Sequence, residues 1–139
     1  MIDQHTGTIS FDEPAFRVHP NLEKATFLSS PLGLTARLLI DNGAWQSFAT
    51  RAKAHERDLA VTLMFRNDLL IETRIAICGK DYSWGTWSEE KVREKKRQHD
   101  DILTNELGDA PCDYGWGSVN SVMDLRGGGS AIVVKYVSE

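Results

Sequence analysis

The pentapeptide Asp-Tyr-x-Trp-Gly occurs twice in the chain, at residues 81–85 and again at residues 113–117. Tyrosine and tryptophan offer a flat apolar face with a polar tip, which suits sugars, bases or a protein surface. With a further tryptophan beside the first copy, the pattern gives a candidate ligand-binding set of Tyr82, Trp84, Trp87, Tyr114 and Trp116. Alternatively, both copies are corners between a strand and a helix, where the aromatic rings cover the helix ends.

Residues that could catalyse a reaction are scattered along the chain. The four histidines, at positions 5, 19, 55 and 99, form no pair at metal-ligand spacing on one element. No Gly-x-Ser-x-Gly elbow is present, and Cys112 has no evident histidine partner. The sequence therefore predicts no catalytic residues, no metal site and no cofactor. An enzyme stays a third alternative, which would need a pocket holding His99 or His19 with two carboxylates.

Charge argues against a nucleic-acid partner. The net charge is −4 and the pI is near 5.6, so no global basic field would gather phosphates. The basic residues between Lys91 and Arg97 point nearly all round a helix and are flanked by acids, which is typical of a solvated, salt-bridged helix. The glycine-rich run at residues 126–130 lacks the lysine and the following helix of a phosphate loop, so it predicts a hairpin turn.

The element that would hold most of these charges is a long helix from Glu89 to Leu107, capped by Ser88 and ended by Gly108. Its apolar stripe is thin, so we expect it to lie on one side of a sheet with His99 packed on that stripe. Carboxylates in and just after this helix could meet a basic partner surface: Glu89, Glu90, Asp100, Asp101, Glu106 and Asp109.

Most other segments predict β-hairpins. Alternation over 34–40 and 44–49 flanks Asn42-Gly43, a strong hairpin signal, and the segments 59–65 and 69–77 have matching apolar faces. A final hairpin joins 119–125 to 131–137. Short extended pieces are expected at 9–11 and 16–18, and a short helix starts after Asn21 and stops at Pro31. The charged segment 51–57 predicts a loop.

A helix of about 19 residues spans roughly 28 Å, since each residue adds about 1.5 Å. If Cys78 precedes this helix and Cys112 follows it, the two thiols lie too far apart for a disulfide. The same separation keeps the two aromatic pentapeptides from forming one continuous cleft.

These patterns predict one α+β domain over residues 1–139: an antiparallel sheet built from hairpins, with one short N-terminal helix and one long helix packed on one side. The first residues lack the basic start and apolar run of a secretory signal, and no stretch reaches the length of a membrane helix. We therefore expect a soluble cytoplasmic protein with reduced thiols. Its oligomeric state is left open.

Two stretches carry a resemblance to a known group of proteins. One runs from Phe16 to Gly33, and the other from Trp116 through the final hairpin to Tyr136. Together they resemble small bacterial single-domain proteins found beside polymorphic or contact-dependent toxin genes, which often act as immunity proteins. The resemblance implies a non-catalytic protein that binds and neutralises a cognate toxin. The alternative is a small-ligand or carbohydrate-binding domain that uses the aromatic pentapeptides.

Overall fold

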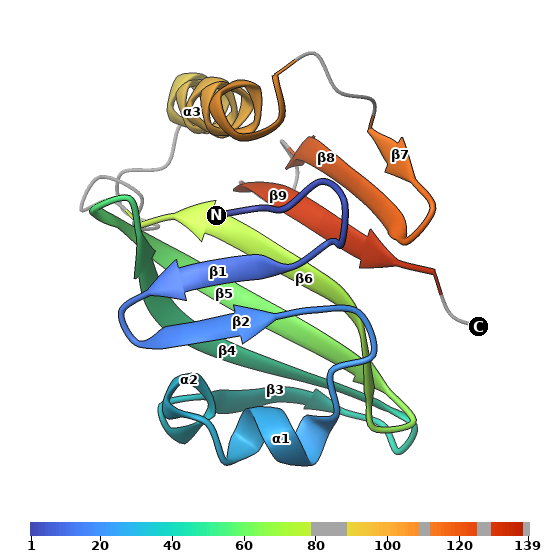
Figure 1. The fold of residues 1–139 in the computed structure, drawn as a ribbon. Helices are drawn as coiled ribbons and strands as arrows, with labels where there is room; N and C mark the ends of the chain where they lie inside the picture. The colour runs from blue at the N-terminus through green and yellow to red at the C-terminus, as the bar shows by residue number, and fades with distance from the viewer. Residues whose placement is uncertain (79–88, 109–111, 125–128, 138–139) are drawn as a thin grey trace.

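The structure is a computed structural model that describes residues 1–78, 89–108, 112–124 and 129–137. A seven-stranded sheet, with every neighbouring pair antiparallel, dominates it (Figure 1). The strands follow the order β3 (Arg37–Asp41), β4 (Trp45–Ala54), β5 (Arg57–Arg66), β6 (Leu69–Ile77), β9 (Gly129–Tyr136), β8 (Gly117–Asp124) and β7 (Asp113–Tyr114). The described helices and strands are an α+β arrangement, as predicted.

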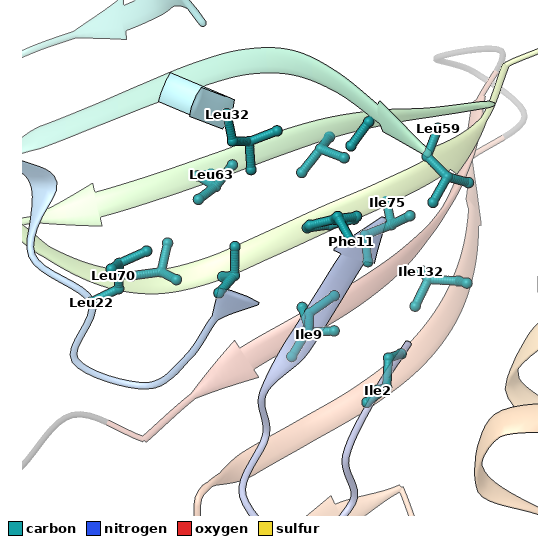
Figure 2. Close-up of a cluster of buried hydrophobic side chains, with 14 of the residues drawn as sticks. Ile2, Ile9, Phe11, Leu22, Leu32, Leu59, Leu63, Leu70, Ile75 and Ile132 are labelled. Atoms are coloured by element: carbon teal, nitrogen blue, oxygen red, sulfur yellow. The ribbon is translucent and has the colours of Figure 1, made fainter. Parts of the chain in front are cut away.

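The N-terminal segment packs on one face of this sheet. β1 (Ile9–Asp12) and β2 (Ala15–Val18) form a separate two-stranded sheet in front of β4, β5 and β6 (Figure 1). Figure 2 shows Phe11 of β1 beside Ile75 of the large sheet, and Ile9 and Leu63 belong to the same buried cluster. All four of these side chains are at most 4% exposed, so the main core lies between the two sheets.

The hairpin of β5 and β6 confirms the strongest strand prediction. Leu59 pairs with Ile77 and Val61 with Ile75 as the alternation required, but a bulge between Met64 and Phe65 places Leu70 on the core face and leaves Leu69, which was expected there, exposed. Asn67 and Asp68 form the two-residue turn with φ values of 51° and 69°. Positive φ at both positions matches the right-handed twist of the strands, and Asn and Asp tolerate it well.

The loop predicted for residues 51–57 is wrong. β4 continues to Ala54 and β5 starts at Arg57, so only His55 and Glu56 form the turn. Ala52 and Ala54 point into the core while Arg51 points away from it. Alanine is a weak strand former, and the polar residues that flank the two alanines, Arg51, Lys53 and His55, hid the alternation.

The single short N-terminal helix is also corrected, because the structure has two. α1 (Lys24–Leu28) begins after Glu23, and α2 (Pro31–Leu34) begins at the proline that was expected to stop the helix. Proline suits the first position of a helix because its missing N–H has no partner there. Ser30 caps α2, since its Oγ accepts the N–H of Gly33 at 3.0 Å. Asn21 adopts a φ of 64° and caps neither helix.

The long helix α3 (Glu89–Leu107) has its predicted bounds, and Gly108 follows it with a φ of 61°. It packs on β9, β8 and β6 at the top of the view in Figure 1. The final hairpin of β8 and β9 is confirmed by its register from Gly117↔Tyr136 to Asp124↔Gly129. Ser88 and most of the glycine-rich turn lie outside the described residues. No helix within the described ranges is both long and apolar enough to cross a membrane.

Candidate functional site

His99 was expected to pack on the apolar stripe of the long helix, and it is completely buried there. Its Nε2 accepts the N–H of Ile77 at 3.0 Å, and its Nδ1 lies 2.9 Å from the hydroxyl of Ser130. Burial lowers the pKa of His99 to about 4, helped by the charges of Lys95 and Lys96 and opposed by that of Asp100. The ring is therefore neutral and closed to solvent, and it joins α3 to β6 and β9.

His55 and Glu106 form a polar cluster beside a cavity. Nε2 of His55 lies 2.7 Å from Oε1 of Glu106, whose Oε2 accepts the amine of Met1 at 3.0 Å and the N–H of Ile2 at 3.4 Å. Burial opposes ionisation of Glu106, but the Met1 amine, the N–H of Ile2 and His55 together hold its pKa below the usual range. The carboxylate is therefore charged at neutral pH and ties α3 to the N-terminus and to the β4–β5 turn.

A cavity of about 320 Å³ opens beside this cluster. Ala54, Leu59 and Ile102 give it an apolar floor, and His55, Arg57 and Glu106 supply its polar rim. A histidine next to a carboxylate is a pair that can exchange a proton with a bound molecule. Sequence reasoning missed this pair because the two residues stand 51 positions apart.

The carboxylates predicted to meet a partner differ in exposure where the structure describes them. Glu90 and Asp101 are exposed, whereas Glu106 is turned into the cluster described above. Asp100 is half-buried and accepts Nζ of Lys96 at 3.0 Å. The side chain of Glu89 and all of Asp109 lie outside the described part of the structure.

One of the two aromatic corners can be placed. Tyr114 and Trp116 stack with their ring centroids 5.0 Å apart and an interplanar angle of 5°. The indole N–H of Trp116 donates to the carbonyl oxygen of Gln4 at 2.8 Å, and its ring lies against Gly7. These contacts hold the N-terminal turn against β8 and β9. Tyr82, Trp84 and Trp87 lie outside the described residues.

Cys78 and Cys112 are both free thiols, as the disulfide argument required. Cys78 is half-buried and Cys112 is exposed. Among the described residues, no group of three or more His, Cys, Asp or Glu side chains could hold a metal ion.

The second face of the large sheet shows an arrangement that no sequence segment reveals. The register places six cationic side chains on this face, remote from the core: Arg37, Arg51, Lys53, Arg66, Arg74 and Lys135. The same face carries the carboxylates of Asp58, Glu72 and Asp113, and two isolated bridges add Glu13 opposite Lys53 and Glu23 opposite Leu69. Six positive charges against five negative ones leave an excess of one among the described side chains of this basic face.

All six cations are exposed, and short side chains lie between them. Ala49, Ala60, Thr62 and Ala76 form a shallow floor across β4, β5 and β6. At one edge, the guanidinium of Arg66 lies 5.3 Å from the ring centroid of Trp45. On the same face, the side chain of Glu72 is buried, with 8% of the residue exposed. Its Oε2 accepts Nε of Arg74 at 2.8 Å, and its Oε1 lies 4.0 Å from Nζ of Lys135.

The chain matches no protein-family model, no curated protein and no solved structure.

Proposed function

We propose that this chain is a non-catalytic binding protein of the bacterial immunity type, which binds and neutralises a cognate toxin protein. The observation that supports the proposal is the basic face of the sheet. The chain as a whole carries a net charge of −4, whereas on this face the cations outnumber the carboxylates by six to five among the described side chains. Such segregation favours one orientation of approach to a charged macromolecule.

The shape of the basic face suits a protein surface better than a small molecule. Its floor of alanine and threonine side chains is shallow, and cations spread over five strands rather than converging on one point. Arginine and tryptophan are the residue types that contribute most to protein interfaces, and Arg66 and Trp45 stand together at its edge. The partner surface that complements this face is acidic.

An acidic protein is favoured over a nucleic acid. Binding of single strands relies on aromatic rings on which bases stack. On the basic face the described aromatic side chain is Trp45, and Arg66 already lies over its ring. Lys53 and Arg74 are also partly neutralised by Asp58 and Glu72, which would repel phosphates.

The exposed carboxylates of α3 remain an alternative contact surface, in which Glu90 and Asp101 meet a basic toxin. Two matched variants separate the surfaces, because each reverses two exposed charges. Arg51→Glu with Lys53→Glu changes the basic face, and Glu90→Lys with Asp101→Lys changes the helix.

The test is to co-express this chain with the product of its neighbouring gene, measure growth of the host, and determine the Kd of the purified complex. The expected result is rescue of growth by the wild-type chain and a Kd that rises at least about tenfold in the basic-face variant. The helix variant should stay within about twofold. A Kd raised only in the helix variant would move the contact to α3. A neighbour that is harmless and forms no complex would remove the proposed function.

A further inference from the structure

The cavity beside His55 and Glu106 is walled by three segments that are distant in the sequence. Met1 comes from the N-terminal segment, Ala54 and Leu59 flank the β4–β5 turn, and Ile102 lies in the last part of α3. The volume of about 320 Å³ falls within the range of about 300–1,000 Å³ that small-molecule sites occupy. At roughly 30 Å³ for each water molecule, the cavity has room for a ligand of about ten non-hydrogen atoms.

The floor of the cavity is apolar. Ala54, Leu59 and Ile102 all belong to the buried core cluster, and their side chains offer water no hydrogen-bond partner. An apolar group of a ligand placed on this floor leaves water, which is favourable. A ligand that fills the cavity therefore carries an apolar body.

Arg57 is a cation without a partner at the rim of this cavity. It pairs with Ala54 across the turn and stands two residues before Leu59, so the register puts its side chain on the core face with these two residues. The side chain is exposed, and within the described ranges its guanidinium makes no hydrogen bond or ion pair. The side-chain amide of Asn105, one helical turn after Ile102, is likewise exposed and unpaired among the described residues.

The carboxylate of Glu106, by contrast, is already occupied. Its Oε1 lies 2.7 Å from Nε2 of His55, and its Oε2 accepts the amine of Met1 at 3.0 Å, which also balances its charge. Asp12 and Glu56 stand near the same turn but do not line the cavity. Among the described residues that do line it, the charge left unpaired is that of Arg57, which favours an anionic ligand over a cationic one.

We propose that this cavity binds a small amphipathic monocarboxylate, whose carboxylate pairs with Arg57 and whose apolar body packs on the floor of the cavity. A guanidinium presents parallel N–H groups that match the two oxygens of a carboxylate, and one positive charge balances one negative charge. The side-chain amide of Asn105 supplies a further hydrogen-bond donor at the rim. The proposal goes beyond the proposed function and does not depend on it.

Titration of the full chain with phenylacetate and with octanoate, followed by amide NMR shifts, tests the proposal, because both acids have about the size of the cavity. The affinity tag belongs at the C-terminal end, since Met1 lines the cavity. The expected result is saturable shifts at Ala54, Leu59 and Ile102, with a Kd between about 10 µM and about 1 mM. Phenylacetamide has a similar shape without the charge and should bind at least about tenfold more weakly.

Three variants locate the bound acid. Arg57→Gln removes the guanidinium and should raise the Kd of phenylacetate at least about tenfold, to the level of phenylacetamide. Ala54→Leu fills the floor and should weaken both ligands. Arg17→Gln is the matched control, because Arg17 of β2 is an exposed arginine that does not line the cavity, and it should keep the Kd within about twofold. Thermal unfolding of each variant checks that the fold is kept.

Three results would overturn the proposal: no saturable shift with either acid up to about 10 mM, a Kd of phenylacetate unchanged by Arg57→Gln, or phenylacetamide bound as tightly as phenylacetate. Shifts confined to residues remote from the cavity would also count against it, because the acid would then bind elsewhere. The proposed function is measured by toxin binding instead, so each idea can fail without the other.

Discussion

His99 of α3 lies 2.9 Å from the hydroxyl of Ser130 on β9, with both side chains buried. Because Nε2 of the ring accepts the N–H of Ile77, the neutral ring carries its hydrogen on Nδ1 and donates it to Ser130. The imidazole thus accepts the main-chain N–H of Ile77 in β6. This N–H lies just beyond Ile75↔Ile132, where the pairing of β6 with β9 ends. The role of His99 is to supply a hydrogen-bond acceptor to β6 where β9 no longer pairs with it.

Replacing His99 with leucine should therefore lower the free energy of unfolding by about 2–4 kcal/mol. Leucine fills the volume but leaves the N–H of Ile77 and the hydroxyl of Ser130 without partners in the core. His99→Gln keeps an acceptor on a side chain of similar reach and should lose less. Urea unfolding of the two variants measures the difference, and equal losses would show that packing rather than hydrogen bonding determines the role of His99.

Stability should also depend on pH through His99. Its folded pKa is about 4, whereas the ordinary value is 6.5. Between these values the unfolded chain binds a proton that the folded chain does not, so the free energy of unfolding decreases as pH falls from about 6.5 to about 4. The full contribution is about 3 kcal/mol, at about 1.4 kcal/mol per pH unit. It is absent in His99→Gln, so urea unfolding of that variant should show a shallower acid slope than wild type. Parallel slopes would contradict the prediction.

The sequence predicts the parts of this fold that depend on short-range patterns. The β5–β6 hairpin follows from alternating Leu59, Val61, Leu63 and Phe65 and from the Asn67-Asp68 turn. The extent of β4 could not be predicted, because Ala52 and Ala54 bury too little apolar surface to mark the core face. The start of α2 was missed because a proline can begin a helix as readily as end one.

The candidate sites depend on long-range pairing and are largely invisible in the sequence. The cations of the basic face come from positions between 37 and 135, and only the strand register brings them together. His55 and Glu106 meet through the packing of α3 beside the β4–β5 turn. By contrast, the burial of His99 was predictable, since its position on the apolar stripe of one helix is a local property.

Glu106→Ala should destabilise the protein by about 1–3 kcal/mol, although the residue lies on a highly charged helix. Its carboxylate accepts the Met1 amine and the N–H of Ile2, and the variant leaves these partly buried donors without this acceptor. Glu90→Ala is the matched control on the same helix, and as an exposed residue it should change stability by less than about 0.5 kcal/mol. Urea unfolding of both variants at pH 7 checks the prediction; similar values would mean that the cluster contributes nothing to folding.

Gly117→Ala should be among the most destabilising single changes in the chain. Gly117 has a φ of 152°, and a Cβ at this position would overlap the carbonyl oxygen of Lys135 on β9. Strand β8 begins here against Tyr136, so relief of the overlap requires the two strands to separate. The expected loss is roughly 3 kcal/mol or more, from backbone strain and steric overlap together.

Gly115→Ala provides the control two residues away, because a Cβ there meets nothing within 4 Å. It should shift stability by less than about 0.5 kcal/mol. Urea midpoints give the comparison, and amide hydrogen exchange locates the damage, which should fall on the Val119 and Val134 amides of the β8–β9 ladder. If Gly117→Ala were as stable as Gly115→Ala, the close approach of the two strands at this end of the sheet would be wrong.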